Sequence, residues 1–272
     1  DQVILIAGTN SDWETEGNDR AELSLPADQD SLIKAILEAN KNTTVVINTG
    51  SPVEMTWIDN ADAVIQTWFA GQEFGNALVD IITGEVNPSG KLPTTFPKNI
   101  ADTPAYDCYP GKDAQMNYDE KLLVGYRWYD RKANDPLFPF GHGLSYTQFQ
   151  YSDLEIKMGG SNEVSCKFMI ANIGDVIGAE VAQCYVAFKN SDNAEPMKTL
   201  QGFAKETIGA GDKKTVEIRL TQRNFSYWDI EEKCWKIRQG SYEILIGSSA
   251  TRIHLTETIS LEQVQEVLLP LV

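Results

Sequence analysis

Histidine is nearly absent from this sequence: the 272 residues include only two, His142 and His254. Neither lies near a motif that would supply a nucleophile, so a Ser-His-Asp or Cys-His enzyme is not expected. A Walker loop and a Gly-x-Gly-x-x-Gly segment after a strand are also missing. The chemistry that these gaps leave open is acid–base catalysis by carboxylates.

Cysteine is scarce as well, and the four residues of this type lie far apart without a Cys-x-x-Cys pair. A zinc site is therefore not expected, and the sequence predicts neither a metal nor a cofactor. Cys166 and Cys184 both fall in strand patterns, where a free buried thiol is the default interpretation. A disulfide between them stays open, because the sequence does not show pairing.

Basic residues are outnumbered: 23 Lys and Arg stand against 39 Asp and Glu, a formal net charge of −16. Such a chain is a poor partner for nucleic acid or anionic membranes, whereas neutral sugars remain compatible. No apolar run approaches the roughly 20 residues of a membrane span. Asn42 and Asn224 begin Asn-x-Ser/Thr triplets, which favour secretion only weakly and leave a cytoplasmic location open.

The first third of the chain alternates strand and helix patterns. Apolar runs predict strands over residues 3–8, 44–48 and 63–68, while helical spacing predicts helices over 27–40 and 73–83. Near-continuous apolar strands in this order indicate an α/β layer with a mostly parallel sheet. A layer of this kind usually holds more strands, so we expect it to be incomplete in this chain, with further elements upstream of Asp1.

Residues 87–149 are rich in proline, glycine and aromatic residues. Such turn-dense segments wrap a surface and form few long elements. We therefore predict a first domain over 1–149, in which about 87–149 is a wrapping linker. Tyr126, Trp128 and Tyr129 are expected mainly to pack beneath it.

From about residue 150 the hydrophobic pattern changes to strict alternation, as in Val164-Ser165-Cys166-Lys167-Phe168. Several such segments separated by turns predict an all-β sandwich of the immunoglobulin or fibronectin type III kind over 150–265, followed by a tail at 266–272. Trp228 and Trp235 are expected in its core, and His254 on a strand face. This half contains no cluster of convergent acids.

The loop at 13–20, Trp-Glu-Thr-Glu-Gly-Asn-Asp-Arg, follows the first predicted strand. In open α/β sheets, ligands bind at the carboxyl ends of the strands. Carboxylates beside an aromatic ring suit sugar chemistry, since the ring stacks and a carboxyl group moves the proton. A solvated acidic loop with one Asp19–Arg20 ion pair explains the same spacing, and spacing alone leaves both interpretations open.

Several short sequence segments follow one another in a characteristic order along almost the whole chain. They are Glu16-Gly17-Asn18-Asp19-Arg20, Ala70-Gly71-Gln72-Glu73, Asn87-Pro88-Ser89-Gly90-Lys91-Leu92-Pro93, Val124-Gly125-Tyr126-Arg127-Trp128-Tyr129, Phe140-Gly141-His142-Gly143-Leu144-Ser145-Tyr146-Thr147, Asn172-Ile173-Gly174, Gly178-Ala179-Glu180-Val181 and Leu200-Gln201-Gly202-Phe203. By their number and order, the chain resembles the carboxyl-terminal part of a glycoside hydrolase family 3 β-glucosidase.

The resemblance implies a retaining enzyme that divides its catalytic pair between domains. The nucleophile would be an aspartate on a (β/α)8 barrel, and the proton donor a glutamate on a loop of the α/β sandwich. This chain contains no barrel and no candidate for that aspartate. Glu16 matches the acid/base position, with Glu14 as the alternative, and Trp13, Asp19 and Arg20 would contact the substrate. Burial against Trp13 would favour the protonated glutamate.

The implied partners are a β-glucoside or oligosaccharide substrate and a barrel, carried on the same precursor or on a separate chain. Association with further copies of this chain stays open. The competing hypothesis is a non-catalytic module that binds carbohydrate or assembles subunits. Glu16 beside Asp19 and Arg20 distinguishes the two, because a pure binding module has no need of a projecting acid.

Overall fold

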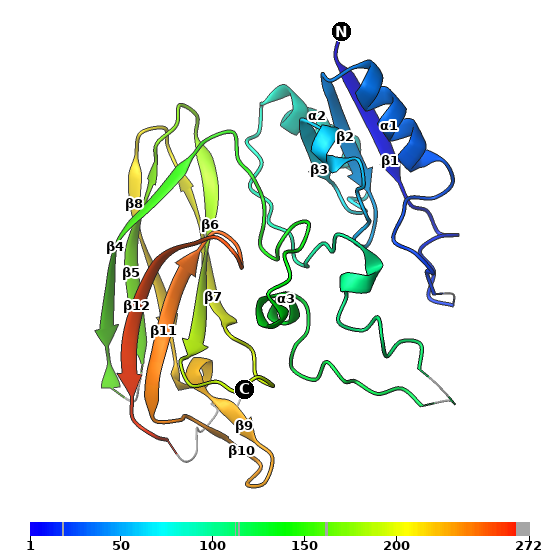
Figure 1. The fold of residues 1–272 in the computed structure, drawn as a ribbon. Helices are drawn as coiled ribbons and strands as arrows, with labels where there is room; N and C mark the ends of the chain where they lie inside the picture. The colour runs from blue at the N-terminus through cyan, green and yellow to red at the C-terminus, as the bar shows by residue number, and fades with distance from the viewer. Residues whose placement is uncertain (18, 112, 114, 161–162, 265–272) are drawn as a thin grey trace. The chain divides into compact units, whose positions relative to one another are not determined.

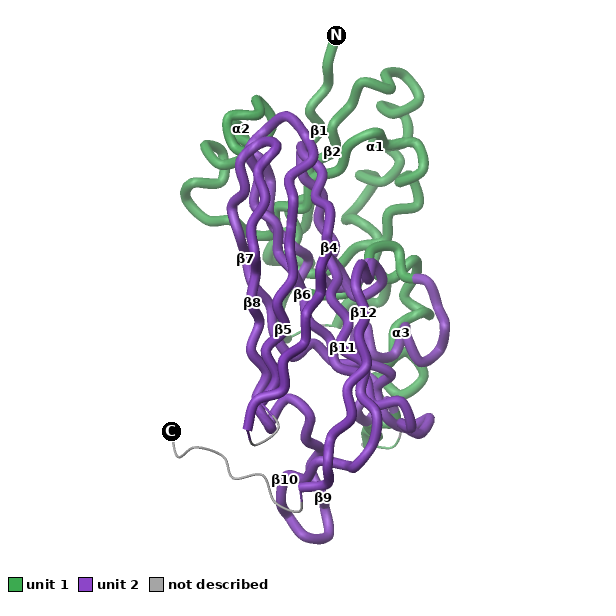
Figure 2. Tube along the Cα trace, turned by 90° about the vertical axis from the view of Figure 1, so that its left-hand side faces the viewer, with its two compact units in different colours: residues 1–86, 94–119, 136–138 green, residues 87–93, 120–135, 139–272 purple. Residues whose placement is uncertain are grey.

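The chain divides into two units that interleave in sequence (Figure 2). The structure, a computed structural model, describes residues 1–17, 19–111, 113, 115–160 and 163–264. Unit 1 comprises 1–86, 94–119 and 136–138, and unit 2 comprises 87–93, 120–135 and 139 onward. Each unit is described separately below. The predicted wrapping segment thus contributes to both units.

Unit 1 is built on a parallel three-stranded sheet of order β1-β2-β3 (Figure 1). Its elements are β1 (Val3–Gly8), α1 (Gln29–Ala39), β2 (Thr43–Asn48), η1 (Ile58–Asn60), β3 (Ala63–Gln66), α2 (Phe74–Thr83) and η2 (Ile100–Asp102). The predicted strands, helices and parallel pairing are confirmed. Helix α2 ends at Gly84, whose φ of 80° is easily adopted only by glycine.

The third strand is shorter than predicted. The apolar run suggested residues 63–68, but β3 ends at Gln66. Trp68 has a φ of 54°, which turns the chain out of the extended conformation that a strand requires. A run of strand-forming residues does not reveal such a turn, and the prediction for the last two residues was therefore wrong.

The core of unit 1 lies between α1 and β2. Ile33 and Leu37 of α1 are fully buried, as are the residues 45–47 of β2, and the two elements are in contact. In Figure 1, α1 runs alongside β1 and β2. Trp57, directly before η1, is also buried and donates its indole N–H to Asp30 Oδ1 at 2.7 Å, which connects the start of η1 to the first turn of α1.

Unit 2 is an antiparallel β-sandwich. One sheet has the order β12-β11-β6-β7 and the other β4-β5-β8. Its elements are α3 (Tyr126–Lys132), β4 (Phe149–Met158), β5 (Val164–Asn172), β6 (Gly178–Phe188), β7 (Thr199–Ile208), β8 (Lys213–Leu220), η4 (Gln222–Phe225), β9 (Tyr227–Asp229), β10 (Cys234–Lys236), β11 (Gly240–Gly247) and β12 (Ile253–Leu261). The alternating pattern from residue 150 onward is confirmed as strands.

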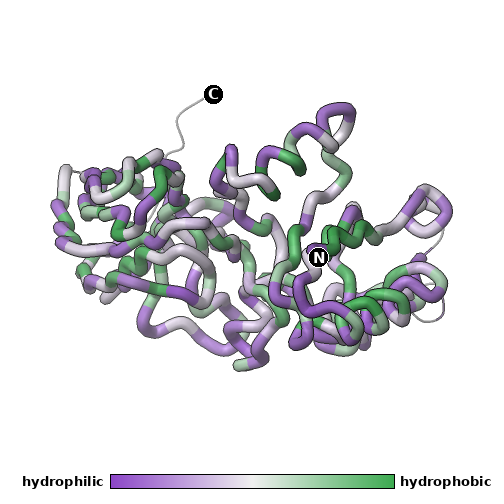
Figure 3. The backbone as a smooth tube through the Cα atoms, turned by 90° about the horizontal axis from the view of Figure 1, so that it is seen from above, coloured by the Kyte–Doolittle hydropathy of each residue, from purple (hydrophilic) through white to green (hydrophobic). Residues whose placement is uncertain are grey.

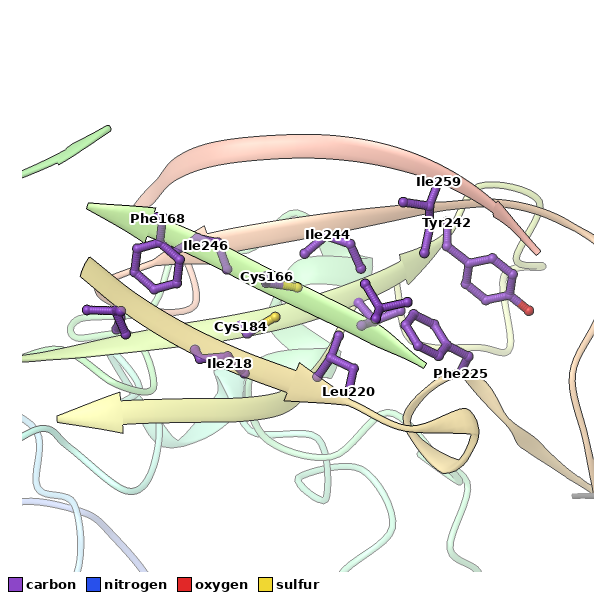
Figure 4. Packing of buried hydrophobic residues seen from close by; sticks show 14 of the residues in the cluster. Cys166, Phe168, Cys184, Ile218, Leu220, Phe225, Tyr242, Ile244, Ile246 and Ile259 are labelled. Carbon is purple, nitrogen blue, oxygen red and sulfur yellow. The ribbon is translucent and has the colours of Figure 1, made fainter. Parts of the chain in front are cut away.

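Alternate side chains of these strands form one hydrophobic core between the two sheets (Figure 4). Phe168 is 1% exposed, while Cys166 of β5 and Cys184 of β6 are fully buried between the sheets. Both cysteines are free thiols, as predicted. The sandwich therefore excludes water from its interior by its own residues.

Tyr126 and Tyr129 of α3 pack as predicted, and Trp128 is half-buried. Tyr129 is buried, and Tyr126 lies 5.1 Å from Phe140 and 5.8 Å from Tyr185 between ring centroids. The Tyr126 hydroxyl also accepts a hydrogen bond from the N–H of Leu200 at 2.8 Å. These contacts fasten the helix to β6 and β7.

Trp228 is not a core residue, which corrects the sequence prediction. It lies on the hairpin formed by β9 and β10, where 47% of its surface is exposed. Its ring packs edge to face on the half-buried Trp235, with centroids 5.2 Å apart. A two-stranded hairpin outside both large sheets has no facing sheet to bury against, so alternation within it does not imply burial.

Hydrophilic and hydrophobic residues are intermixed along the trace (Figure 3). Among the residues that the structure describes, no helix is both long and apolar enough to cross a membrane. The longest helix is α1, with 11 residues, followed by α2 with 10.

Candidate active site

The acidic loop begins where β1 ends, at the carboxyl edge of the parallel sheet. Thr9 continues the ladder by donating its N–H to Asn48 O at 3.1 Å. Asn10 then organises a turn: its Oδ1 accepts the N–H groups of Asp12 at 3.0 Å and Trp13 at 3.2 Å. Its backbone carbonyl accepts the N–H of Glu14 at 2.9 Å. An asparagine at this position thus directs the following residues back across the strand ends.

Glu14 is held by polar groups from two strand ends. Its Oε1 accepts a hydrogen bond from the Thr9 hydroxyl and another from the N–H of Gly50 at 2.9 Å. Gly50 has no room for a side chain, since a Cβ there would lie 2.5 Å from Glu14 Oε2 and 2.8 Å from the Phe69 ring. The Glu14 carboxylate therefore joins the loops that follow β1 and β2.

Arg20 is the half-buried cation of the loop. Its Nη1 donates to Ser51 Oγ at 2.9 Å, its Nη2 to Ser24 O at 3.3 Å, and its guanidinium lies 5.9 Å from the centroid of the Trp13 ring. Burial lowers the pKa of Arg20, while the negative charges of Glu14 and Glu22 act in the opposite direction. An arginine side chain does not lose its proton in proteins, so the group remains charged at neutral pH.

Two buried donors of this loop have no acceptor among the described residues: Trp13 Nε1 and Arg20 Nε. An unsatisfied buried donor costs about 1–3 kcal/mol, more for a charged group. Both atoms are shielded from solvent in this structure, so an acceptor from outside the described chain would reach them only after the loop rearranges.

Asp19 accepts a hydrogen bond from the hydroxyl of Tyr109, which lies 90 positions further along the sequence in the same unit. The same hydrogen bond raises the pKa of Tyr109. No salt bridge joins Asp19 to Arg20 in the described chain, so the single ion pair offered as the alternative interpretation of this loop is not formed.

Glu16 differs from Glu14 in its surroundings. Its side chain is exposed, and no hydrogen bond or ion pair connects its carboxylate to any residue that the structure describes. The burial against Trp13 that we expected for it is thus not present here. Glu14 and Glu16 are only two residues apart. The Glu14 carboxylate is hydrogen-bonded to Thr9 and Gly50, whereas the Glu16 carboxylate is exposed and has no partner among the described residues.

The neighbours that define the site come from parts of the chain that sequence reasoning did not select. Gly50, Ser51 and Tyr109 each contact a predicted site residue. Gly50 and Ser51 follow β2 directly, and the carboxyl ends of parallel strands share one edge. The Thr49-Gly50-Ser51-Pro52 turn therefore carried a usable signal, whereas nothing near Tyr109 marked it. Among the described residues, no group of three His, Cys, Asp or Glu side chains fits a metal ion.

Comparison with family models places these features in a known group. The model of the glycosyl hydrolase family 3 C-terminal domain matches residues 1–146, more than half of the chain. The chain belongs to glycosyl hydrolase family 3. A second model, the fibronectin type III-like domain, matches residues 180–250 within the sandwich. This family 3 chain thus consists of an α/β C-terminal domain followed by a fibronectin type III-like domain.

Curated relatives are similar along nearly the whole chain. Thermostable beta-glucosidase B of Acetivibrio thermocellus is 42% identical over 262 residues, which cover 95% of this chain and 35% of the relative. A beta-glucosidase of Rhizobium radiobacter is 39% identical over 270 residues, with 96% and 33% covered. The chain therefore spans about a third of the length of these relatives.

Solved structures agree with the fold. The beta-glucosidase of Kluyveromyces marxianus in complex with glucose matches with a TM-score of 0.93 and 36% identity, over 97% of this chain and 32% of that one. The GH3 beta-glucosidase of Bifidobacterium adolescentis also gives a TM-score of 0.93 and 36% identity, with 100% and 40% covered.

Proposed function

We propose that the chain carries the acid/base half of a retaining β-glucosidase that hydrolyses terminal non-reducing β-D-glucosyl residues, with Glu16 as the acid/base. The observation that carries the proposal is the contrast between the two candidate glutamates. Glu14 is occupied by Thr9 and Gly50, whereas Glu16 is exposed and has no partner among the described residues. The similar proteins named beta-glucosidase support the choice of substrate.

An exposed loop carboxyl group suits a site that another domain completes. In a retaining mechanism the two carboxyl groups stand about 5–5.5 Å apart, one attacking the anomeric carbon and the other protonating the leaving oxygen. The attacking aspartate is proposed to lie on a (β/α)8 barrel outside this chain. Docking of the barrel and the sugar would remove water from Glu16 and so favour its protonated form.

The remaining loop residues are proposed to bind the sugar. Trp13 offers an indole ring, Arg20 a half-buried positive charge beside that ring, and Tyr109 holds Asp19 in place by a hydrogen bond. A β-glucoside or an oligosaccharide ending in glucose fits this set, since aromatic stacking and directed hydrogen bonds are typical of ligand sites.

The first strand supports the proposed need for a further domain. Ile4 and Ile6 point to the same face of β1 and are 48% and 54% exposed. Parallel sheets are normally covered on both faces. We propose that a further domain, carried on the same precursor or on a separate chain, covers this face and supplies the barrel.

The decisive variant is Glu16→Gln, assayed with the proposed (β/α)8 barrel present, on the same polypeptide or as a separate chain. The amide is nearly isosteric but cannot donate a proton in the same way, so kcat should fall by roughly 10²–10⁴-fold for substrates with poor leaving groups. Aryl β-glucosides with increasingly acidic phenols should recover rate, because their departure needs little protonation. The measurement is kcat against leaving-group pKa for the variant and the unmodified enzyme.

Glu14→Gln is the matched control, because its amide oxygen can still accept from Gly50. We expect a small loss that does not depend on the leaving group. A graded loss from Glu14→Gln in place of Glu16→Gln would move the assignment to Glu14. If neither variant changed kcat in a folded protein, the chain would be a non-catalytic carbohydrate-binding or assembly module.

A further inference from the structure

A pocket of about 580 Å³ opens in unit 2, away from the acidic loop in sequence and formed by different residues. Its wall combines the end of the segment before β4, the start of β4 itself, and the turn that leads into β12. Pockets of roughly 300–1,000 Å³ with a few convergent polar groups are the usual sites of small ligands. The size is ample for a molecule with one ring.

The inner wall of the pocket is formed by polar side chains that bond to one another. Lys91 Nζ lies 3.1 Å from Glu180 Oε1, with only 13% and 6% of the two side chains exposed. The hydroxyl of Tyr151 donates to the same carboxylate oxygen at 3.2 Å, and Lys91 Nζ donates to Gly143 O at 2.9 Å. The charge of Glu180 is therefore compensated internally and does not repel an incoming anion strongly.

An aromatic pair forms a second side. The rings of Tyr151 and His254 are parallel within 2°, with centroids 4.2 Å apart. His254 Nε2 shares a hydrogen bond of 2.9 Å with Ser248 Oγ, which fixes the plane of the imidazole. Burial lowers the pKa of His254, and the positive charges of Arg252 and Lys91 lower it further. The pocket thus has a flat, neutral ring beside a positive potential.

Arg252 supplies the uncompensated charge. Its side chain is exposed and forms no hydrogen bond or ion pair with any residue in the described part of the chain. Among the lining residues, Lys91 and Arg252 stand against Glu180, which leaves one net positive charge in a chain whose formal charge is −16. A free guanidinium is the side chain best suited to a carboxylate or phosphate, which it can bind through two parallel hydrogen bonds.

We propose that this pocket binds a ring-bearing organic anion, with its carboxylate or phosphate group on Arg252 and its ring against His254. The pocket is much larger than a bare oxyanion, and Leu144, Phe149 and Ile173 add apolar wall for the body of the ligand. The proposal concerns a binding site only. It does not depend on Glu16 or on the assignment of β-glucosidase activity.

The test uses the fact that His142 and His254 are the only histidines. The chain is labelled in its histidine rings, and the two imidazole signals are followed by NMR during titration with four probes. Glucuronate or glucose 6-phosphate should shift the His254 signal more than that of His142, with a Kd of about 1 mM, a value typical of a weak site. The two arms show whether a carboxylate or a phosphate is preferred.

Neutral glucose and inorganic phosphate are the other two probes. Glucose should leave both signals in place up to about 50-fold the Kd of the preferred anion. A glucose shift as large as the anion shift would overturn the role of charge. Inorganic phosphate binding as tightly as glucose 6-phosphate would overturn the role of the ring. No shift of His254 with either sugar anion would overturn the proposal as a whole.

Arg252→Gln should weaken binding of the preferred anion at least about tenfold, since it removes the charged fork. The matched control is Arg219→Gln, an exposed arginine of β8 in the same unit that pairs with Glu217 rather than lining the pocket. It should leave the Kd unchanged. Equal affinities for the Arg252→Gln variant and the unmodified chain, with the backbone spectrum preserved, would contradict the assignment.

Discussion

Strands β1 and β5 are both rich in apolar residues, yet the two units use them differently. In β5, every second side chain from Val164 to Asn172 is buried between the facing sheets. In β1 only Ala7 is buried, and Ile4 and Ile6 remain about half exposed. The described chain therefore completes the core of the sandwich but leaves part of the parallel sheet uncovered.

Polar groups show the same contrast. All four buried side-chain atoms without a partner in the described chain lie in unit 1: Trp13 Nε1, Arg20 Nε, Gln66 Oε1 and Thr95 Oγ1. Trp13 and Arg20 lie in the loop after β1, and Gln66 is the last residue of β3. Native interiors satisfy nearly all such groups, so among the described residues unit 1 is less completely satisfied than unit 2.

The contrast predicts that truncating a core side chain of the sandwich strongly lowers the stability of unit 2. Phe168→Ala should cost roughly 3–5 kcal/mol of the stability of unit 2, because the cavity lies in a core that nothing else can fill. Amide hydrogen exchange in β5 and β6, followed by mass spectrometry, measures this loss separately from unit 1. Exchange in β2 should not change.

Phe203→Ala is the matched control, since Phe203 lies on β7 of the same unit but is 69% exposed. We expect it to stay within about ±0.5 kcal/mol. Equal destabilisation by the two substitutions would contradict the account of where the sandwich core lies.

A smaller loss is expected at the edge of the parallel sheet. Gly50→Ala places a methyl group 2.5 Å from Glu14 Oε2 and 2.8 Å from the Phe69 ring. The resulting shift should cost about 1–3 kcal/mol in unit 1. It should also raise the exchange rate of the loop after β1, because the Gly50–Glu14 hydrogen bond is strained.

Gly75→Ala provides the comparison, because nothing lies within 4 Å of a Cβ at this position of α2. There alanine should stabilise by up to about 1 kcal/mol, as expected for glycine replaced in a helix. Thermal unfolding of both variants measures the difference, and a neutral Gly50→Ala would show that Glu14 is not held as described.

The smallest loss of stability per substituted residue is expected on the uncovered face. Replacing Ile4 and Ile6 together with serine should cost about 1 kcal/mol for each residue in the unfolding free energy of the isolated chain, since half of each side chain already contacts water. The same change should reduce self-association, which exposed apolar patches promote. Sedimentation at several concentrations measures this. Unchanged association would mean that β1 does not present a docking face.

Much of this architecture could be predicted from periodicity. The parallel strands, α1, α2 and the alternating strands of the sandwich follow directly from where Val, Ile and Leu recur. The end of β3 could not be predicted, because the left-handed turn at Trp68 has no signal in hydrophobicity. The exposure of Trp228 was missed because its hairpin has no facing sheet.

Spacing predicted a candidate site on the loop at 13–20 but did not separate its two glutamates, and only the family resemblance preferred Glu16 to Glu14. Glu14 and Glu16 lie on one loop, so spacing treats them alike. The distinction depends on Gly50, which comes from the end of another strand and contributes a backbone N–H that sequence patterns do not display. The hydrogen bond between Tyr109 and Asp19 could not be predicted either, because it joins residues 90 positions apart in the sequence.

The central claim is that this chain holds one half of a catalytic pair, and assay of the purified chain tests it most directly. The 272-residue chain is incubated with 4-nitrophenyl β-glucoside, beside its Glu16→Gln variant and the chain together with the proposed barrel. We expect turnover only when the barrel is present, because a single carboxyl group cannot form the covalent glycosyl intermediate of a retaining enzyme. Clear turnover by the chain alone, abolished by Glu16→Gln, would contradict this claim.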